Sequence, residues 1–257
     1  MRRGVWLFPS SSATSLVDAI VAAENHGLDE VWIADEGVAR EPMTVLAAAS
    51  TRTSTIRLAT GITSPLLRHP GAIAASAATL DELSGGRAVL GIGVGGHLSL
   101  EPFGLVADRP VAVLREAITT ARAVLGGVAG DDYQPPAHAM PARAVPIWVG
   151  ARGPQLVRTA ARLADGLFVS GCSSDELEVI VDNTTGVSTF ELAVYQSATD
   201  RPTAASEHDW DRVADTLETM VARCAPASIG INLVETLGGA DPVGLVERAA
   251  EVLSRFS

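Results

Sequence analysis

The sequence predicts an α/β protein that folds as a single (β/α)8 TIM barrel, compact and with shortened insertions. Eight short apolar runs alternate with longer stretches of helical spacing along the 257 residues. An open doubly wound sheet usually has about five or six strands, whereas eight alternating units in about 250 residues match a barrel. No linker or change of composition divides the chain, so residues 1–257 are expected to form one domain.

The first two units set the pattern. A strand is expected over residues 3–8 and a helix over residues 15–26, which Gly27 ends as a left-handed cap does. A second strand is expected over residues 30–34. It leads to a helix over residues 42–51 that has proline in its first turn.

Residues 57–96 contain the segment around which the site is expected. They predict a strand over residues 58–63, an alanine-rich helix over 69–83 and a strand over 87–94. Parallel strands joined by a helix bring their C-terminal ends to the same side, where barrels bind ligands. The two strand ends that meet there are Gly61-Ile62-Thr63-Ser64-Pro65 and Gly91-Ile92-Gly93-Val94-Gly95-Gly96.

The remaining units continue the alternation after an irregular loop over residues 96–108. A helix is expected over residues 110–125. Residues 126–144 have no periodicity and are either a lid or a disordered surface loop. The further strands are expected over residues 146–150, 166–170, 190–195 and 228–234, and the further helices over residues 154–164, 175–181, 209–224 and 241–256.

Charge and composition exclude several classes of function. A net charge of -11 without a basic run argues against nucleic acid or an anionic membrane surface as partner. All 19 basic residues are arginine, which removes lysine Schiff-base chemistry. The five histidines lack the spacing of metal ligands, so no metal is expected.

Cysteine use and hydropathy point to the cytoplasm. Cys172 and Cys224 are far apart in the sequence and support neither a disulfide framework nor a zinc site. The first apolar run is too short for a signal peptide, and no run reaches the roughly 18 apolar residues of a membrane span.

Two acidic residues follow the second expected strand directly. Asp35 and Glu36 would point to opposite sides of an extended chain, so one of them faces the barrel axis more easily. They are candidates for catalysis, and the alternative is an acidic cap of the next helix.

Two turns are candidates for ligand binding. Thr63 and Ser64 offer hydroxyl groups at the third strand's end, where glycine and proline also fit an ordinary turn. The turn at residues 150–154 leads into a helix opened by proline. Its free N–H groups and Arg152 suit a phosphate, although an ordinary βα turn has the same features.

Four motifs in this order resemble the bacterial luciferase-like superfamily, and within it the branch that uses coenzyme F420, a deazaflavin, as do methylenetetrahydromethanopterin reductase relatives. They are HGLDEVWIADE, TGITSPLLRHP, TLDELSGGRAVLGIGVG and VPIWVGARGPQLVRTAARLADGLFVSG.

The resemblance implies a barrel whose C-terminal mouth holds a flavin-type ring. A non-prolyl cis peptide bond at Gly61–Ile62 would support the ring, and Asp35 would lie near it. Gly153 and Pro154 would meet the cofactor phosphate. The implied cofactor-binding residues are Thr60, Gly61, Ile62, Thr63, Ser64, Gly93, Val94, Gly95, Gly150, Ala151, Arg152, Gly153, Pro154, Ser170 and Gly171, and the catalytic candidates are Asp35 and Glu36.

The implied function is hydride transfer between coenzyme F420 and a small organic substrate. An FMN-dependent monooxygenase is one alternative. A non-catalytic flavin-binding or interaction barrel is another, because Gly96 stands where sugar-phosphate dehydrogenase relatives have a catalytic glutamate. Barrels of this family pair through helices beside the second and third units, which implies a homodimer.

Overall fold

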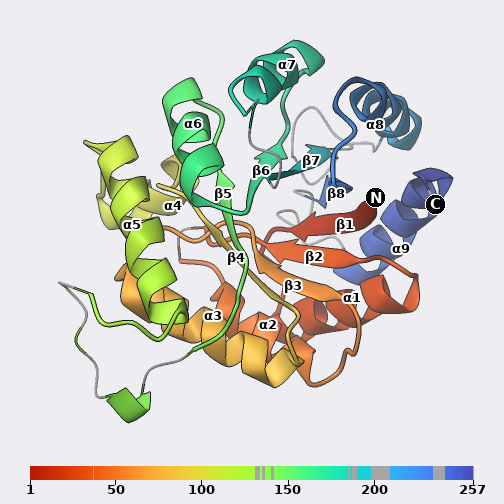
Figure 1. Ribbon diagram of the computed structural model, residues 1–257. Coiled ribbons are helices and arrows are strands. Elements are labelled where there is room, and N and C mark those ends of the chain that lie inside the picture. Colours follow the sequence, from red (N-terminus) through yellow and green to blue (C-terminus); the bar gives the residue numbers. More distant parts are fainter. Residues whose placement is uncertain are drawn as a thin grey trace.

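Eight parallel strands close into a barrel in the order of the sequence, with β8 beside β1 (Figure 1). The computed structural model describes residues 1–36, 38–130, 134, 137–139, 142–184, 186, 190–197, 209–233 and 241–256. The strands are β1 (Arg2–Leu7), β2 (Glu30–Ile33), β3 (Arg57–Thr60), β4 (Ala88–Ile92), β5 (Ile147–Gly150), β6 (Gly166–Ser170), β7 (Glu191–Ser197) and β8 (Ser228–Leu233). The predicted barrel is confirmed.

Helices surround the strands and return the chain from each strand's end to the next strand's start (Figure 1). Among the described residues they are α1 (Ala13–Asn25), α2 (Pro42–Ser50), α3 (Pro70–Ser84), α4 (His97–Leu100), α5 (Pro110–Leu125), α6 (Pro154–Leu163), α7 (Ser174–Asp182), α8 (Trp210–Cys224) and α9 (Pro242–Leu253). The short 3-10 helices are η1 (Glu101–Phe103), η2 (Ala137–Ala139) and η4 (Ser254–Phe256). No described helix is both long and apolar enough to cross a membrane.

Most expected elements agree with the structure within three residues at their ends. The third strand ends at Thr60 rather than at residue 63, because the chain leaves the strand at Gly61. The loop expected to be irregular contains α4 and η1, which are too short to produce a helical pattern in the sequence. The expected end of the last strand, residue 234, lies outside the described residues.

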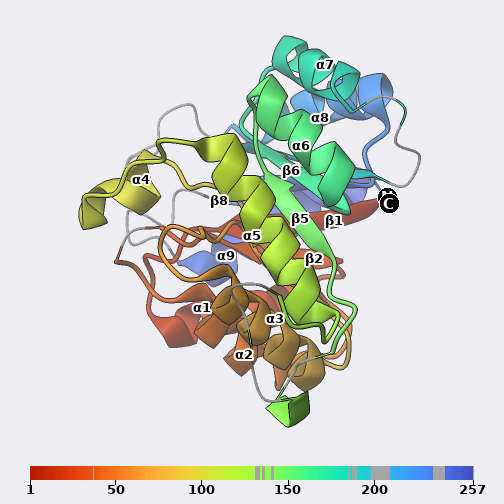
Figure 2. The same cartoon turned by 60° about the vertical axis from the view of Figure 1, so that its left-hand side comes forward.

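The segment over residues 126–144 begins and ends at the N-terminal end of the barrel. Gly126 pairs with Ala142, and the Arg143 N–H donates to the Leu125 carbonyl at the end of α5. Figure 2 places η2 far from α4, which lies at the opposite end. The interpretation as a lid over the C-terminal mouth is therefore wrong for the described part of this segment. Residues 131–133, 135, 136, 140 and 141 lie outside the described residues.

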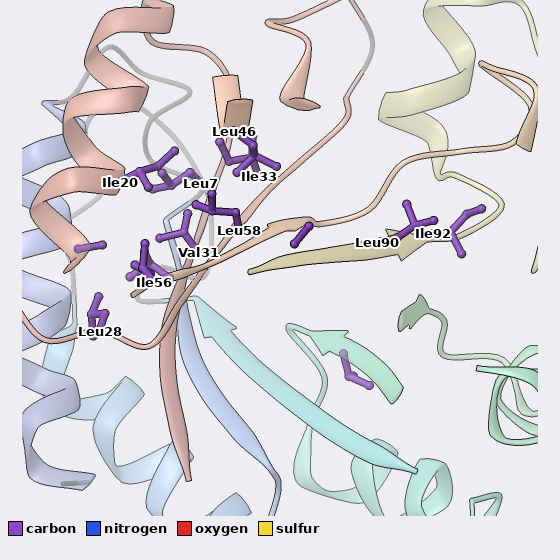
Figure 3. Close-up of a cluster of buried hydrophobic side chains, with 14 of the residues drawn as sticks. Leu7, Ile20, Leu28, Val31, Ile33, Leu46, Ile56, Leu58, Leu90 and Ile92 are labelled. Carbon is purple, nitrogen blue, oxygen red and sulfur yellow. The ribbon is translucent and has the colours of Figure 1, made fainter. Parts of the chain in front are cut away.

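Alternation along the strands separates two apolar layers. Residues that face outward, including Leu7, Val31 and Leu58, pack with helix residues such as Ile20 and Leu46 (Figure 3). The largest apolar residues that face inward are aromatic: Trp6, Phe8, Trp32, Trp148, Phe168 and Tyr195. Because these rings fill the barrel interior, a ligand must bind at one of its two ends.

The N-terminal end of the interior is closed by one buried acid. The Glu30 side chain is 1% exposed, and its Oε1 accepts hydrogen bonds from Trp32, Tyr195 and Ser228. Its Oε2 lies 3.2 Å from Arg2 Nε and 3.3 Å from Arg57 Nη1. Burial and the neighbouring Glu30 charge hold the pKa of Tyr195 well above its usual value. This network supports the fold at the end opposite to the mouth.

Candidate active site

The C-terminal ends of β2 and β3 bring an acid and a hydroxyl group together. Asp35 follows β2, and its Oδ2 accepts a hydrogen bond of 2.6 Å from the Thr63 hydroxyl. Thr63 is itself fixed to β4, since its N–H donates to the Gly91 carbonyl and its carbonyl accepts from the Gly93 N–H. Asp35 is thus held beside the segment that the sequence predicted as the ligand-binding edge.

The peptide bond between Gly61 and Ile62 is cis, as the family resemblance implied. The Trp6 indole N–H donates to the Gly61 carbonyl across the barrel interior. A Cβ atom at Gly61 would come within 2.9 Å of both Trp6 Cδ1 and Trp32 Cβ. Gly61 therefore permits a close approach of β3 to two indole side chains.

The Ile62 side chain occupies the space that glycines leave at the ends of β4 and β5. A Cβ atom at Gly93 would clash with Ile62 Cδ1, and a Cβ atom at Gly150 would come within 2.9 Å of Ile62 Cγ2. Both glycines were predicted as cofactor-binding residues. In the structure they first make room for Ile62, and their contact with a ligand remains a prediction.

Two hydroxyl groups predicted to bind the cofactor are engaged within the protein. Thr60 Oγ1 donates to the Gly91 carbonyl at 2.8 Å and accepts from the Gly91 N–H at 3.0 Å. Ser64 Oγ donates to the Val94 carbonyl at 3.0 Å. These side chains hold the end of β3 against β4, and Gly95 continues the same turn with a φ of 85°.

The two candidate acids have separate partners. Glu36 Oε2 accepts from the Ser99 hydroxyl on α4 at 2.7 Å, whereas Asp35 faces Thr63. Burial raises the pKa of Asp35 above its ordinary value, and the Thr63 hydrogen bond opposes this shift. Burial also raises the pKa of Glu36, with the charge of Asp35 acting in the same direction. Asp35 and Glu36 therefore both hold a proton more readily than an exposed carboxylate does, which suits acid-base chemistry.

The turn after β5 lies beside the end of β6. Arg152 Nη2 donates to the Ser170 carbonyl, and it would lie 3.6 Å from a Cβ atom at Gly171. Ala151 is half-buried, whereas Gly153 and Pro154 are exposed where α6 begins. No side chain caps this helix start, so its backbone N–H groups are open to an anion. The structure thus groups the residues predicted to meet a phosphate.

Three residues near the mouth were not identified from the sequence. Trp6 contacts Gly61, Ser99 contacts Glu36, and Asn232 Nδ2 donates to Ser170 Oγ at 2.6 Å. Each contact joins residues more than 50 positions apart, which local patterns do not reveal. The alternation of Ser228, Gly230 and Asn232 along β8 was the one signal that places Asn232 on the inner face.

A cavity of about 790 Å³ lies at the N-terminal end of the barrel. It is lined by arginines that are all ion-paired: Arg2 with Glu30 and Glu191, Arg57 with Glu30, Arg122 with Asp165, and Arg143 with Asp81. The charges of these arginines are compensated, and the cavity lies away from the loops that follow the strands. Both observations favour a structural role for this end of the barrel. The C-terminal mouth is the stronger candidate site.

Comparison with known proteins agrees with the motifs. The family model described as luciferase-like monooxygenase matches residues 1–187. A 5,10-methylenetetrahydromethanopterin reductase of Methanolobus tindarius is 32% identical over 187 residues, which cover 70% of this chain and 57% of the relative. An F420-dependent glucose-6-phosphate dehydrogenase of Nakamurella multipartita is 34% identical over 183 residues, covering 64% of this chain and 54% of the relative. The chain thus spans little more than half the length of these relatives.

Solved structures show the same fold at lower sequence identity. The coenzyme F420 dependent tetrahydromethanopterin reductase of Methanopyrus kandleri superposes with a TM-score of 0.81 at 22% identity, covering 100% of this chain and 99% of that chain. The monooxygenase RslO1 of Streptomyces bottropensis has a TM-score of 0.76 at 18% identity and covers 99% and 98%.

Proposed function

The chain belongs to the luciferase-like monooxygenase family, and from this premise we propose that it is an oxidoreductase that transfers hydride between coenzyme F420 and a small organic substrate. The observation that carries the proposal is the Asp35–Thr63 pair beside Ile62 at the C-terminal mouth. The F420-dependent relatives support the choice of cofactor, and the matched region contains both catalytic candidates.

The residues at the mouth fit the parts of this cofactor. Ile62, seated between Gly93 and Gly150, offers an apolar surface to one face of a planar ring. Arg152 and the uncapped start of α6 offer a positive charge and N–H groups to a phosphate. When bound, the deazaflavin accepts or supplies the hydride.

Asp35 is the residue we assign to proton transfer. Its carboxylate is partly removed from water, and a hydrogen bond from Thr63 fixes its orientation. Glu36 is the second candidate, and Ser99 on α4 orients it in the same way. The protein would bind the ring, keep water from one face and place an acid near the substrate.

Cofactor titration tests this proposal directly. Purified protein is titrated anaerobically with oxidised F420 and, in parallel, with oxidised and reduced FMN, and saturable fluorescence changes are recorded. Saturable F420 binding supports the proposal. Binding of FMN alone would replace it with an FMN-dependent monooxygenase. Tight binding of either cofactor with no turnover of any substrate tested, in wild type as in Asp35 variants, would instead indicate a non-catalytic barrel.

Asp35→Asn is expected to lower turnover by about 10²- to 10⁴-fold, the range for loss of a general acid or base. The fold should not weaken, because asparagine can still accept the Thr63 hydrogen bond. Burial raises the pKa of Asp35, so the wild-type fold loses stability as pH rises through that pKa. In thermal unfolding between pH 4 and 8, the melting temperature of the variant relative to that of wild type should therefore increase as pH rises.

Asp18→Asn is the matched control, since Asp18 is exposed and pairs with Arg52 on the helical surface. It should leave turnover unchanged. Wild-type turnover in Asp35→Asn would remove Asp35 from the mechanism.

We further propose that the chain is one domain, is cytoplasmic and forms a homodimer through α2 and α3, as barrels of this family do. Sedimentation velocity at micromolar concentration should give the mass of a dimer. A monomer under these conditions would contradict the proposed homodimer. It would not affect the proposal that the active site lies at the C-terminal mouth.

A further inference from the structure

One buried polar atom near the mouth has no partner. Asn232 is 9% exposed, and its Oδ1 is the single buried side-chain oxygen or nitrogen without a hydrogen bond among the residues that the structure describes. Leaving a buried acceptor unpaired costs free energy, and native proteins seldom do so without a reason. An apolar side chain of similar size would avoid that cost.

Asn232 faces the interior at the C-terminal end of β8. Two residues earlier, a Cβ atom at Gly230 would clash with the Tyr195 ring. Four residues earlier, the Ser228 hydroxyl reaches Glu30 inside the barrel. Because side chains alternate along a strand, Asn232 is the next inward residue, and it lies above the aromatic layer.

The neighbours of Asn232 connect it to the proposed ring site. It pairs in register with Trp6, whose indole N–H donates to the carbonyl of Gly61, the residue before Ile62. Its Nδ2 donates to Ser170 Oγ, and the Ser170 carbonyl accepts from Arg152. The unpaired oxygen therefore stands between the two parts of the mouth assigned to ring and phosphate.

The Ser170 hydroxyl complements the unpaired oxygen. It accepts a hydrogen bond from Asn232, and its own proton has no acceptor among the described contacts. Asn232 thus offers an acceptor and Ser170 a donor side by side. This arrangement matches a group in which an N–H lies next to a carbonyl, as in a lactam or a cyclic imide.

We propose that Asn232 and Ser170 bind the imide edge of the ring at the mouth. The Asn232 Oδ1 accepts the ring N–H, and the Ser170 hydroxyl donates to the adjacent ring carbonyl. The inference rests on the proposed function, because flavin and deazaflavin rings both carry such an edge. It adds to that function a residue on β8 that orients the ring.

A ligand that lacks the imide proton provides the test. Wild-type protein should bind F420, or FMN if that is the cofactor, at least tenfold more tightly than the same cofactor methylated at the imide nitrogen. A tenfold ratio corresponds to about 1.4 kcal/mol. This comparison needs no protein variant. Equal binding of the two ligands by wild type would overturn the proposal.

Asn232→Leu should remove the discrimination and bind both ligands alike, with weaker binding of the unmethylated cofactor. Its melting temperature should change little, because the substitution loses the hydrogen bond to Ser170 Oγ but also removes an unpaired buried acceptor. Ser228→Ala is the matched control on the same strand and face: it loses the bond to Glu30, so it should melt at lower temperature and keep the tenfold discrimination.

The outcomes separate this inference from the proposed function. If wild type binds neither F420 nor FMN, the proposed function fails and the inference fails with it. If wild type binds a cofactor and Asn232→Leu keeps the wild-type affinity and discrimination, only the inference fails, and the partner of Asn232 is then a water molecule.

Discussion

Glu30→Gln is expected to lower the free energy of unfolding by about 3–5 kcal/mol, the usual cost of breaking a buried ion pair from one side. The Glu30 carboxylate accepts from three neutral donors and pairs with Arg2 and Arg57. A glutamine amide carries N–H groups where the protein also presents donors, and it leaves the guanidinium groups without their buried counter-charge. Urea unfolding followed by circular dichroism measures the change.

Glu191→Gln is the matched control for this experiment. Glu191 also pairs with Arg2, but its side chain is 44% exposed, so its loss should cost no more than about 1 kcal/mol. Folded Glu30→Gln should bind cofactor like wild type, because Glu30 lies at the end of the barrel opposite to the mouth. Similar small losses of stability in both variants would show that the interior network contributes little.

Gly93→Ala is expected to weaken cofactor binding by at least about tenfold, equivalent to about 1.4 kcal/mol. The added methyl group would clash with Ile62 Cδ1 and come within 2.9 Å of the Gly150 carbonyl oxygen. Ile62 must then move toward the space assigned to the ring. A modest loss of stability, of about 1–3 kcal/mol, should accompany the change, as for other overpacked sites.

Gly96→Ala is the control, since a Cβ atom there meets nothing within 4 Å. It should keep wild-type affinity in the same fluorescence titration, although Gly96 is only three residues further along the chain. Wild-type affinity in Gly93→Ala as well would show that Ile62 does not support the ring.

The barrel was predictable because each strand–helix unit contains its own local signals for where its elements begin and end. Prolines open α2, α3, α5 and α6, and left-handed glycines such as Gly27 and Gly85 end the elements before the next strand. Such signals are local and repeat along the chain, so counting them gives the topology. The short α4 lacks enough residues for a period, and it was missed for that reason.

Part of the site was predictable for a different reason. Asp35 and Thr63 each follow a strand, and parallel strands bring their C-terminal ends together. Residues 61–65 alone also fit an ordinary turn, and only the family resemblance, which rests on all four motifs together, implied a cis peptide bond at Gly61–Ile62. Its cis geometry agrees with that expectation.

Local sequence patterns did not predict the contacts across the barrel interior. Glu30 looks like the first residue of an ordinary strand, while its partners come from residues 2, 57, 195 and 228. Asn232 likewise meets Ser170 and Trp6 only after the barrel closes. Which inward side chains meet depends on the stagger of the strands, and no local pattern encodes it.

A crystal structure of the protein with oxidised F420 tests the central claim most directly. The ring is predicted to lie against Ile62 at the C-terminal ends of β3, β4 and β5, with the cofactor phosphate beside Arg152 and the start of α6. Binding of F420 in the arginine-lined cavity at the N-terminal end, or a mouth that FMN occupies and F420 does not, would contradict the account.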